Sequence, residues 1–292
     1  MNKEFNKGLL LTSFGSFWWG FIGVIYFKYL DFIGFVEVVI HRCVWTAATL
    51  LITTILFSKW KIFFLIISNK KYLVGLFFSG FLIFLNWSVW IYAVATDKII
   101  DASFGYFIMP ILSVFLGYIF FKEKLNKKRI FSISLVMVSI IFILFFNIKS
   151  LPWVGIIVGL SWGFYNLIRK KINVDTDIGL LIESLFILPF ALIAFYFVYK
   201  NGLNDFSLDN PGLSLFILLA GPMTVIPLFL YVRGVELCGL GPTGMIFYIT
   251  PTLQFLLGYF YYGEAFSLIK FVSFILIWIA VIIYLKDLYE TN

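Results

Sequence analysis

Charged residues are scarce in this chain. Of its 292 residues only 13% are Asp, Glu, Lys or Arg, whereas 62% are hydrophobic. Soluble domains carry about twice that charged fraction, so the composition excludes an ordinary soluble domain. Apolar runs of about 20 residues recur along the chain and predict α-helices that cross a bilayer. The alternating apolar and polar pattern of a membrane β-barrel is missing.

Histidine and cysteine are also rare, with one His and two Cys in the whole chain. One histidine is too few for most metal sites, and Cys43 and Cys238 lack the Cys-x-x-Cys spacing of redox or zinc motifs. The sequence has no His-Glu-x-x-His, no Gly-x-Ser-x-Gly and no phosphate-binding Gly-Lys-Ser/Thr loop. We therefore expect no enzyme, no self-contained ATP-driven pump, no metal and no cofactor.

The net charge of +7 does not indicate a nucleic-acid partner, because the basic residues cluster in short loops between apolar segments. Sixteen Lys and Arg residues fall in one set of alternate loops and five in the other, with Arg42 left inside a segment. The positive-inside rule then places both termini in the cytoplasm. The chain is expected to cross the membrane many times.

Ten membrane-spanning segments are predicted from the apolar runs. They cover residues 8–30, 33–57, 72–95, 99–121, 130–148, 152–168, 178–199, 213–235, 241–262 and 267–286. The apolar stretch 62–67 is too short to cross, and the lysines on both sides of it favour an interfacial turn. The longest outside loop, residues 200–212, has turn composition and either closes over a cavity or has no role.

An internal repeat relates the two halves of the chain. Residues 108–123 and 249–264 match at a constant offset of 141 with seven identities, and Trp19 has a similar echo in Trp162. A chance match of proline, glycine, tyrosine and glutamate at fixed spacing is a weak alternative to duplication. The alignment gives each half five spans. Because five is an odd number, the second half must be inverted relative to the first.

The predicted fold is therefore an all-α polytopic membrane protein with ten transmembrane helices in two inverted five-helix repeats. The first repeat covers residues 1–150 with spans 1 to 5, and the second covers residues 151–292 with spans 6 to 10. Inverted repeats with a site near the membrane midplane are the architecture of many secondary transporters.

Three ionisable residues interrupt the second apolar segment. Glu37 and His41 are four residues apart and share one helix face, and Arg42 follows directly. A charge in mid-membrane costs several kcal/mol unless it has a partner or faces a water-filled cavity. Substrate binding, proton coupling and internal ion pairing all stay open for this cluster. His41 titrates near neutrality and could carry a coupling proton, whereas Arg42 keeps its charge.

Other polar residues within the apolar segments are further candidates. Glu183 lies in the repeat partner of the second segment, where a structural or gating role is preferred over substrate contact. It could also bind a cation, accept a proton or neutralise Arg42 or Arg169. Asn86 and Asn166 are amides that need partners inside a membrane, and interhelical hydrogen bonding is the commoner reason for such residues.

Aromatic residues near these positions could line a pocket for an aromatic or cationic molecule. Interface anchoring and core packing are the alternatives for any single ring. The candidates are Trp18, Trp19, Trp87, Tyr106, Trp162, Tyr165 and Tyr248.

Prolines break the helical hydrogen bonding at three candidate hinges. Pro110 and Pro251 lie at matched depths in the two halves, and Pro227 lies in the eighth predicted span. Such kinks either bend helices or act as hinges for alternating access. Their matched placement favours hinges.

The motifs, taken in order, resemble those of one family. They are Glu37-x-x-x-His41-Arg42, Asn86-Trp87, the Ala-Ser-Phe-Gly-Tyr-Phe-Ile-Met-Pro run ending at Pro110, Phe164-Tyr165 with Arg169-Lys170-Lys171, Ile182-Glu183, and Tyr248-Ile-Thr-Pro-Thr252. In this combination the chain resembles the RarD permeases of the EamA branch of the drug/metabolite transporter superfamily. The resemblance implies a ten-helix inner-membrane secondary transporter made of two inverted five-helix repeats.

The chain departs from that family pattern at three positions. Met109 stands where Asn usually precedes the proline, Phe247 where Gln often precedes the tyrosine, and Val225 where Thr is common. Each change removes a side chain that could form a hydrogen bond in a cavity, so a substrate preference is not carried over.

The leading functional hypothesis is a secondary transporter that moves a small organic metabolite or drug-like solute by alternating access. A proton gradient is the expected energy source, so the expected partners are the solute, protons and the lipid bilayer. Uncoupled uniport or exchange is one alternative. A non-transporting membrane protein such as a receptor is the other. The sequence assigns no oligomeric state.

Overall fold

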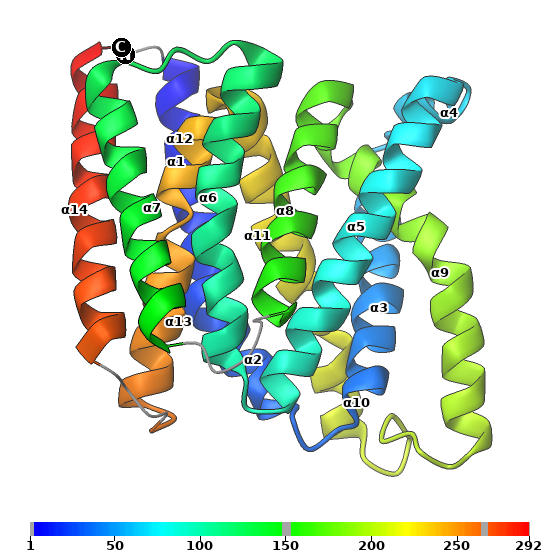
Figure 1. Ribbon diagram of the computed structural model, residues 1–292. Helices are drawn as coiled ribbons and strands as arrows, with labels where there is room; N and C mark the ends of the chain where they lie inside the picture. Colours follow the sequence, from blue (N-terminus) through cyan, green and yellow to red (C-terminus); the bar gives the residue numbers. More distant parts are fainter. Residues whose placement is uncertain (1–2, 148–152, 264–267, 292) are drawn as a thin grey trace.

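The computed structural model describes residues 3–147, 153–263 and 268–291, and within these ranges it contains helices and the loops that join them. Figure 1 shows the long helices packed side by side as a bundle, with the start of the first helix and the end of the last at the same edge. The expected boundary between the halves at residues 150 and 151 lies outside the described residues, as do Lys149 and the Glu264 of the repeat.

The helices of the first half follow the predicted segments closely. They are α1 (Lys3–Phe17), the π-helix η1 (Trp18–Gly23), α2 (Val24–Tyr29), α3 (Phe35–Leu56), α4 (Trp60–Ile67), α5 (Lys70–Ala95), α6 (Ile99–Phe121) and α7 (Lys127–Asn147). The expected interfacial turn at residues 62–67 is instead the short helix α4. Its apolar side chains are largely exposed.

Breaks are more frequent in the helices of the second half. These helices are α8 (Trp153–Ile172), α9 (Thr176–Lys200), α10 (Pro211–Leu218), α11 (Ala220–Cys238), α12 (Leu240–Ile246), α13 (Ile249–Phe260) and α14 (Leu268–Thr291).

Six of the helical segments in the described ranges are long and apolar enough to cross a membrane. They are Lys3–Tyr29, Phe35–Leu56, Lys70–Ala95, Thr176–Lys200, Pro211–Cys238 and Phe271–Glu290. Helices α6, α7, α8 and α12 with α13 occupy the other predicted segments without meeting the same criteria of length and composition. The chain is thus an all-helical membrane protein in its described part, and the count of ten spans stays a prediction.

The three predicted proline hinges differ in their surroundings. Pro110 lies inside the continuous helix α6, and Pro227 lies inside α11. Only Pro251 lies beside a break in its segment, because α12 ends at Ile246 and α13 begins at Ile249. A further irregularity at η1 was not predicted, and π-helical segments of this kind occur often at functional sites.

Glycines bring α6 and α8 into backbone contact. A side chain at Gly105 would collide with the backbone of Gly155, and a Cβ at Gly159 would lie 2.6 Å from the carbonyl oxygen of Gly105. Gly155 and Gly159 are four residues apart and so share one face of α8. Small residues at this spacing are typical of close helix packing in membranes. The contact sets the position of Tyr106, the next residue on α6.

The two halves pack in matching ways. Helix α1 packs on α11 as α8 packs on α5, and α3 packs on α9, α6 on α12 and α7 on α14. Figure 1 shows that α1 and α8 run in opposite directions through the bundle, and that α6 and the α12–α13 segment do so too.

Candidate functional site

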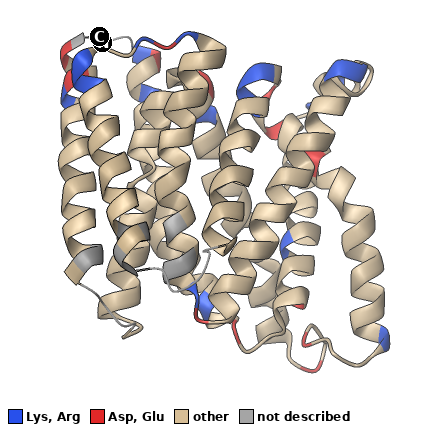
Figure 2. Ribbon diagram, in the orientation of Figure 1, with Lys and Arg blue, Asp and Glu red and all other residues tan. Residues whose placement is uncertain are grey.

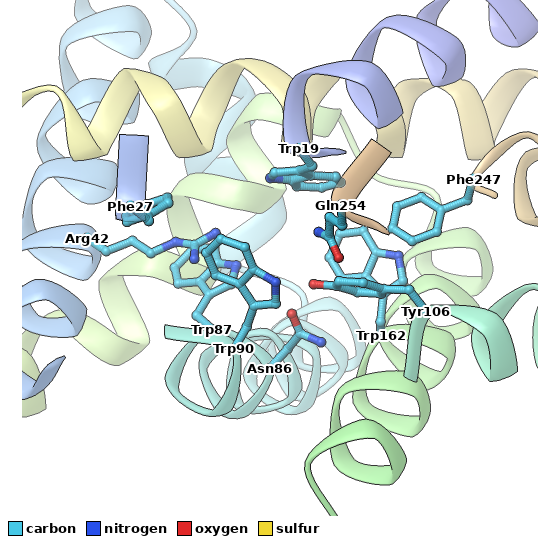
Figure 3. A pocket seen from close by; sticks show the side chains of 10 residues that line it. All are labelled: Trp19, Phe27, Arg42, Asn86, Trp87, Trp90, Tyr106, Trp162, Phe247 and Gln254. Carbon is cyan, nitrogen blue, oxygen red and sulfur yellow. The ribbon is translucent and has the colours of Figure 1, made fainter. Parts of the chain in front are cut away.

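A small cavity lies where elements of both halves meet. The space open to the centre of a water-sized sphere is about 20 Å³, which is enough for about one water molecule. Its wall comes from η1, α2, α3, α5, α6, α8, α13 and the break before α13. The lining residues are Trp19, Phe27, Arg42, Asn86, Trp87, Trp90, Tyr106, Trp162, Phe247 and Gln254 (Figure 3). The cavity is therefore almost filled by its own side chains.

Arg42 is the charged residue of this wall. It is 4% exposed, and among the described residues no carboxylate lies within ion-pair distance of its guanidinium. The guanidinium instead stacks over aromatic rings, with its carbon 4.8 Å from the ring centre of Phe27, 4.7 Å from that of Trp87 and 5.8 Å from that of Trp90 (Figure 3). Such cation–π contacts stabilise a buried cation only in part.

Hydrogen-bond donors exceed acceptors around Arg42. Its Nε and the indole N–H groups of Trp87 and Trp90 are buried without an acceptor among the described residues. On the opposite wall, the Oε1 atom of Gln254 is buried without a donor. Asn86, by contrast, has hydrogen-bond partners. Its Nδ2 donates to the carbonyl oxygen of Val158 at 2.9 Å and to Ser161 Oγ at 3.2 Å. Burying these groups without hydrogen-bond partners costs free energy, and a ligand that bonded to them would remove that cost.

Residues related by the internal repeat meet at this cavity. The ring centres of Tyr106 and Phe247, which are 141 positions apart, lie at 5.3 Å. Trp19 and Trp162, the echo found in the sequence, have ring centres 4.9 Å apart. Next to them, Tyr248 OH donates to the carbonyl oxygen of Phe107 at 2.9 Å, again across 141 positions. Contacts between equivalent residues are expected on a two-fold axis.

Glu37 and His41, by contrast, are not in the cavity wall. The Glu37 carboxylate accepts the backbone N–H of Asp205 at 2.9 and 3.0 Å and that of Phe206 at 3.0 Å. His41 Nε2 lies 3.4 Å from Glu37 Oε1, and Trp45 Nε1 donates to His41 Nδ1 at 3.1 Å. An indole N–H only donates, so Nδ1 is the acceptor and the ring proton is on Nε2. Glu37 thus holds the loop between α9 and α10.

Replacing Glu37 by alanine is expected to free this loop. The amide hydrogens of Asp205 and Phe206 would lose their acceptor. They should then exchange with deuterium at least about tenfold faster, because no hydrogen bond has to open before exchange. Hydrogen exchange measured by mass spectrometry on the purified protein tests this. The Asp209→Asn variant is the matched control, since Asp209 is exposed in the same loop. Equal exchange rates in the two variants would contradict the clamp.

Glu183 belongs to a separate buried cluster. Its carboxylate lies 3.5 Å from Arg169 Nη1, and it accepts hydrogen bonds from Ser79 Oγ and, at 3.2 Å, from Tyr165 OH. Glu183 and Arg169 are each 2% exposed. Of the two arginines that the sequence offered as its partner, Arg169 rather than Arg42 is the neighbour.

The remaining predicted site residues also lie apart from the cavity wall. Asn166 is buried in α8, and neither of its amide atoms has a hydrogen-bond partner among the described residues. Tyr248 lines an apolar hollow between α13 and α14 instead. Trp18 and Tyr165 are likewise outside the wall, whereas Trp19 and Trp162 are part of it.

Sequence reasoning did not propose four of the lining residues, Phe27, Trp90, Phe247 and Gln254, as site residues. Phe247 was noted only as a departure from a family pattern. One signal was available for Gln254, because it is the single glutamine in the chain and lies inside an apolar segment. The phenylalanines gave no signal, since the chain has 37 of them.

Both halves of the chain are similar to known proteins. The EamA-like transporter family matches this chain twice, over residues 6–145 and 150–286, so the family domain is duplicated. An uncharacterized transporter of Vibrio cholerae serotype O1 is 34% identical over 98% of this chain and 94% of its own. The uncharacterized transporter YojE of Bacillus subtilis is 32% identical, over 97% of this chain and 95% of that protein.

Two further likenesses cover nearly the whole chain. Protein RarD of Escherichia coli is 30% identical over 99% of this chain and 97% of its own. One solved structure superposes with a TM-score of 0.68, covers 95% of this chain and 96% of that one at 13% identity, and so shares the fold. The chain belongs to the EamA-like transporter family, as a permease of the RarD type.

Proposed function

We propose that the chain is a secondary transporter that moves a small organic metabolite or drug-like solute by alternating access. The observation that carries this proposal is the cavity at the contact between the two halves, with a buried Arg42 in its wall that has no carboxylate partner in the described part of the chain. Arg42, Asn86, Trp87 and Tyr106 are the proposed substrate contacts. A purely structural role explains poorly why a guanidinium that has no carboxylate partner among the described residues would be kept inside an apolar bundle.

We further propose that ten helices cross the membrane as two inverted five-helix repeats. The matching helix pairs and the opposite directions of α1 and α8 support this arrangement. So do the ring contacts of Trp19 with Trp162 and of Tyr106 with Phe247, because equivalent residues meet on the axis between inverted repeats. Rocking of the two halves about this axis would open the cavity to each side in turn.

The proposed location is the inner membrane, with both termini in the cytoplasm. Figure 2 shows most Lys and Arg residues gathered at the edge of the bundle where α1 begins and α14 ends. This distribution supports the orientation through the positive-inside rule.

The cavity represents a nearly closed state in this proposal. Space for about one water cannot hold an organic solute, so the rings of the wall must move apart during transport. The π-helical segment η1 contains Trp19, and Phe247 lies in the break between α12 and α13. This segment and this break are the proposed points of movement, together with Pro110, Pro227 and Pro251.

Proton coupling through His41 is the proposed energy source. Because Nδ1 accepts from Trp45, protonation of His41 must break that contact, and the resulting cation would bind Glu37 more strongly. Asp205 is the other titratable group beside Glu37, and burial together with the Glu37 charge raises the pKa of Asp205. A proton on His41 would thereby act on the loop clamp and, through α3, on Arg42. Glu183 and Asn166 are assigned to gating and bracing rather than to substrate contact.

The His41→Gln variant tests the coupling. Proteoliposomes containing an internal pH-sensitive dye receive a pH gradient together with a solute that stabilises the purified protein. We expect wild-type protein to accumulate the solute with a matched proton flux, and the variant to retain only downhill movement. Cys43→Ala, a buried change on the same helix, is the control. Wild-type transport that ignores the gradient would favour uniport or exchange, and binding without movement would favour a receptor.

A further inference from the structure

We infer that the cavity binds a small monocarboxylate with a flat apolar body, and that Arg42 pairs with its carboxylate. This deepens the proposed function by naming a substrate class, yet binding can be measured whether or not the protein transports.

Arg42 carries a charge that the described part of the chain does not neutralise. A guanidinium cannot lose its proton at any physiological pH, so burial cannot be relieved by titration. The stacked rings of Phe27, Trp87 and Trp90 offer partial compensation and leave Nε without an acceptor. The other buried arginine in this part of the chain, Arg169, has Glu183 beside it. Among the described residues, Arg42 therefore has no neighbouring anion, whereas Arg169 has one.

The number of charges limits the anion. Arg42 is the only charged residue among the described residues that line the cavity. A phosphate dianion or a dicarboxylate would bring a second negative charge with no cation to meet it, and an uncompensated buried charge is strongly unfavourable. A monoanion leaves the site neutral. A cationic solute, which aromatic walls would otherwise attract, would be repelled by Arg42.

The shape and chemistry of the wall select the rest of the ligand. A guanidinium fork matches the two oxygens of a carboxylate. The indole N–H groups of Trp87 and Trp90 are also buried without acceptors and lie beside the guanidinium. Seven aromatic rings make up most of the wall, which suits a flat apolar body. Gln254 Oε1 is the matching acceptor for a hydroxyl or amino hydrogen on that body.

Benzoate, benzamide and benzylammonium provide the test, because they share one ring and differ in charge. The purified full chain is unfolded by heat with a thiol-reactive dye, since Cys43 and Cys238 are free and buried and react only on unfolding. At equal ionic strength, we expect benzoate to raise the melting temperature in a dose-dependent way. Benzamide, benzylammonium and inorganic phosphate should leave it unchanged.

Variants at Arg42 extend the test. Arg42→Gln should weaken the apparent Kd for benzoate at least about tenfold, and Arg42→Lys should fall between because it keeps the charge without the fork. Cys43→Ala is again the control on the same helix, and Cys238 still reports its unfolding. If Arg42→Gln does not fold, the comparison of benzoate, benzamide and benzylammonium on wild-type protein and the affinity of Arg42→Lys for benzoate still test the inference.

Three results would overturn the inference. They are stabilisation by benzylammonium or benzamide equal to that by benzoate, no stabilisation by benzoate, and an affinity for benzoate that Arg42→Gln leaves unchanged. Failure of the proposed transport function gives a different pattern. In that case benzoate would bind with the expected dependence on Arg42, while proteoliposomes would move no solute.

Discussion

Replacing Glu183 by leucine is expected to lower the free energy of unfolding by about 3–5 kcal/mol, because it leaves a buried cation unpaired. Arg169, which is 2% exposed, would lose the carboxylate 3.5 Å from its Nη1. Ser79 Oγ and Tyr165 OH would lose their acceptor at the same time. Equilibrium unfolding in mixed micelles measures the difference. A large loss of stability would show that Glu183 braces the fold, which is a different role from proton coupling.

Two further variants make this result interpretable. The double variant Arg169→Leu with Glu183→Leu should recover much of the loss, because removing both charges of a buried pair is often nearly neutral. Glu290→Gln is the control, since Glu290 pairs with Lys128 at the surface, where ion pairs contribute about 0–1 kcal/mol. If Glu183→Leu cost no more than this control, Glu183 would not be what stabilises Arg169. A folded Glu183→Gln variant without pH-dependent transport would assign Glu183 to coupling instead.

Replacing Gly105 by valine is the second change with a large expected effect. The new side chain would meet the backbone of Gly155 on α8, and a backbone cannot move aside as the end of a side chain can. Overpacking of a tight contact typically costs about 1–3 kcal/mol and occasionally more, and we expect the upper end here. The yield of monodisperse protein in gel filtration and the melting temperature should both fall.

Gly34→Ala is the matched control for this prediction. A Cβ at Gly34 has no neighbour within 4 Å, and the residue precedes α3 in a conformation that alanine adopts readily. We expect it to behave as wild type. A Gly105→Val protein as stable as Gly34→Ala would show that α6 and α8 do not need backbone contact.

The helix positions were predictable because they depend on local properties. Apolar runs and their length decide where a chain can enter a membrane, and each predicted segment coincides with helical structure in the described residues. The helix breaks were less predictable. Pro110 and Pro251 are equivalent in sequence, yet α6 continues through Pro110 while the other segment is broken before Pro251. The proline alone therefore does not decide whether a helix breaks.

The candidate site was predicted only in part, for a geometric reason. His41 and Arg42 are neighbours in sequence and read as one cluster, but successive residues on a helix point about 100° apart. His41 therefore faces Glu37 and the loop, while Arg42 faces the cavity. Gln254 and Phe247 come from the other half of the chain. Their approach to Arg42 depends on tertiary packing, which no local pattern contains.

The contact between equivalent residues has a consequence for how a solute would sit. Four of the aromatic residues of the cavity form two related pairs, but the guanidinium comes from the first half alone. A symmetric homodimer would present two arginines at the same axis and attract two negative charges. Duplication within one chain removes that constraint. A carboxylate held by Arg42 would then keep its head towards α3 whichever side of the membrane it entered from, so one fixed binding pose would serve both directions of transport.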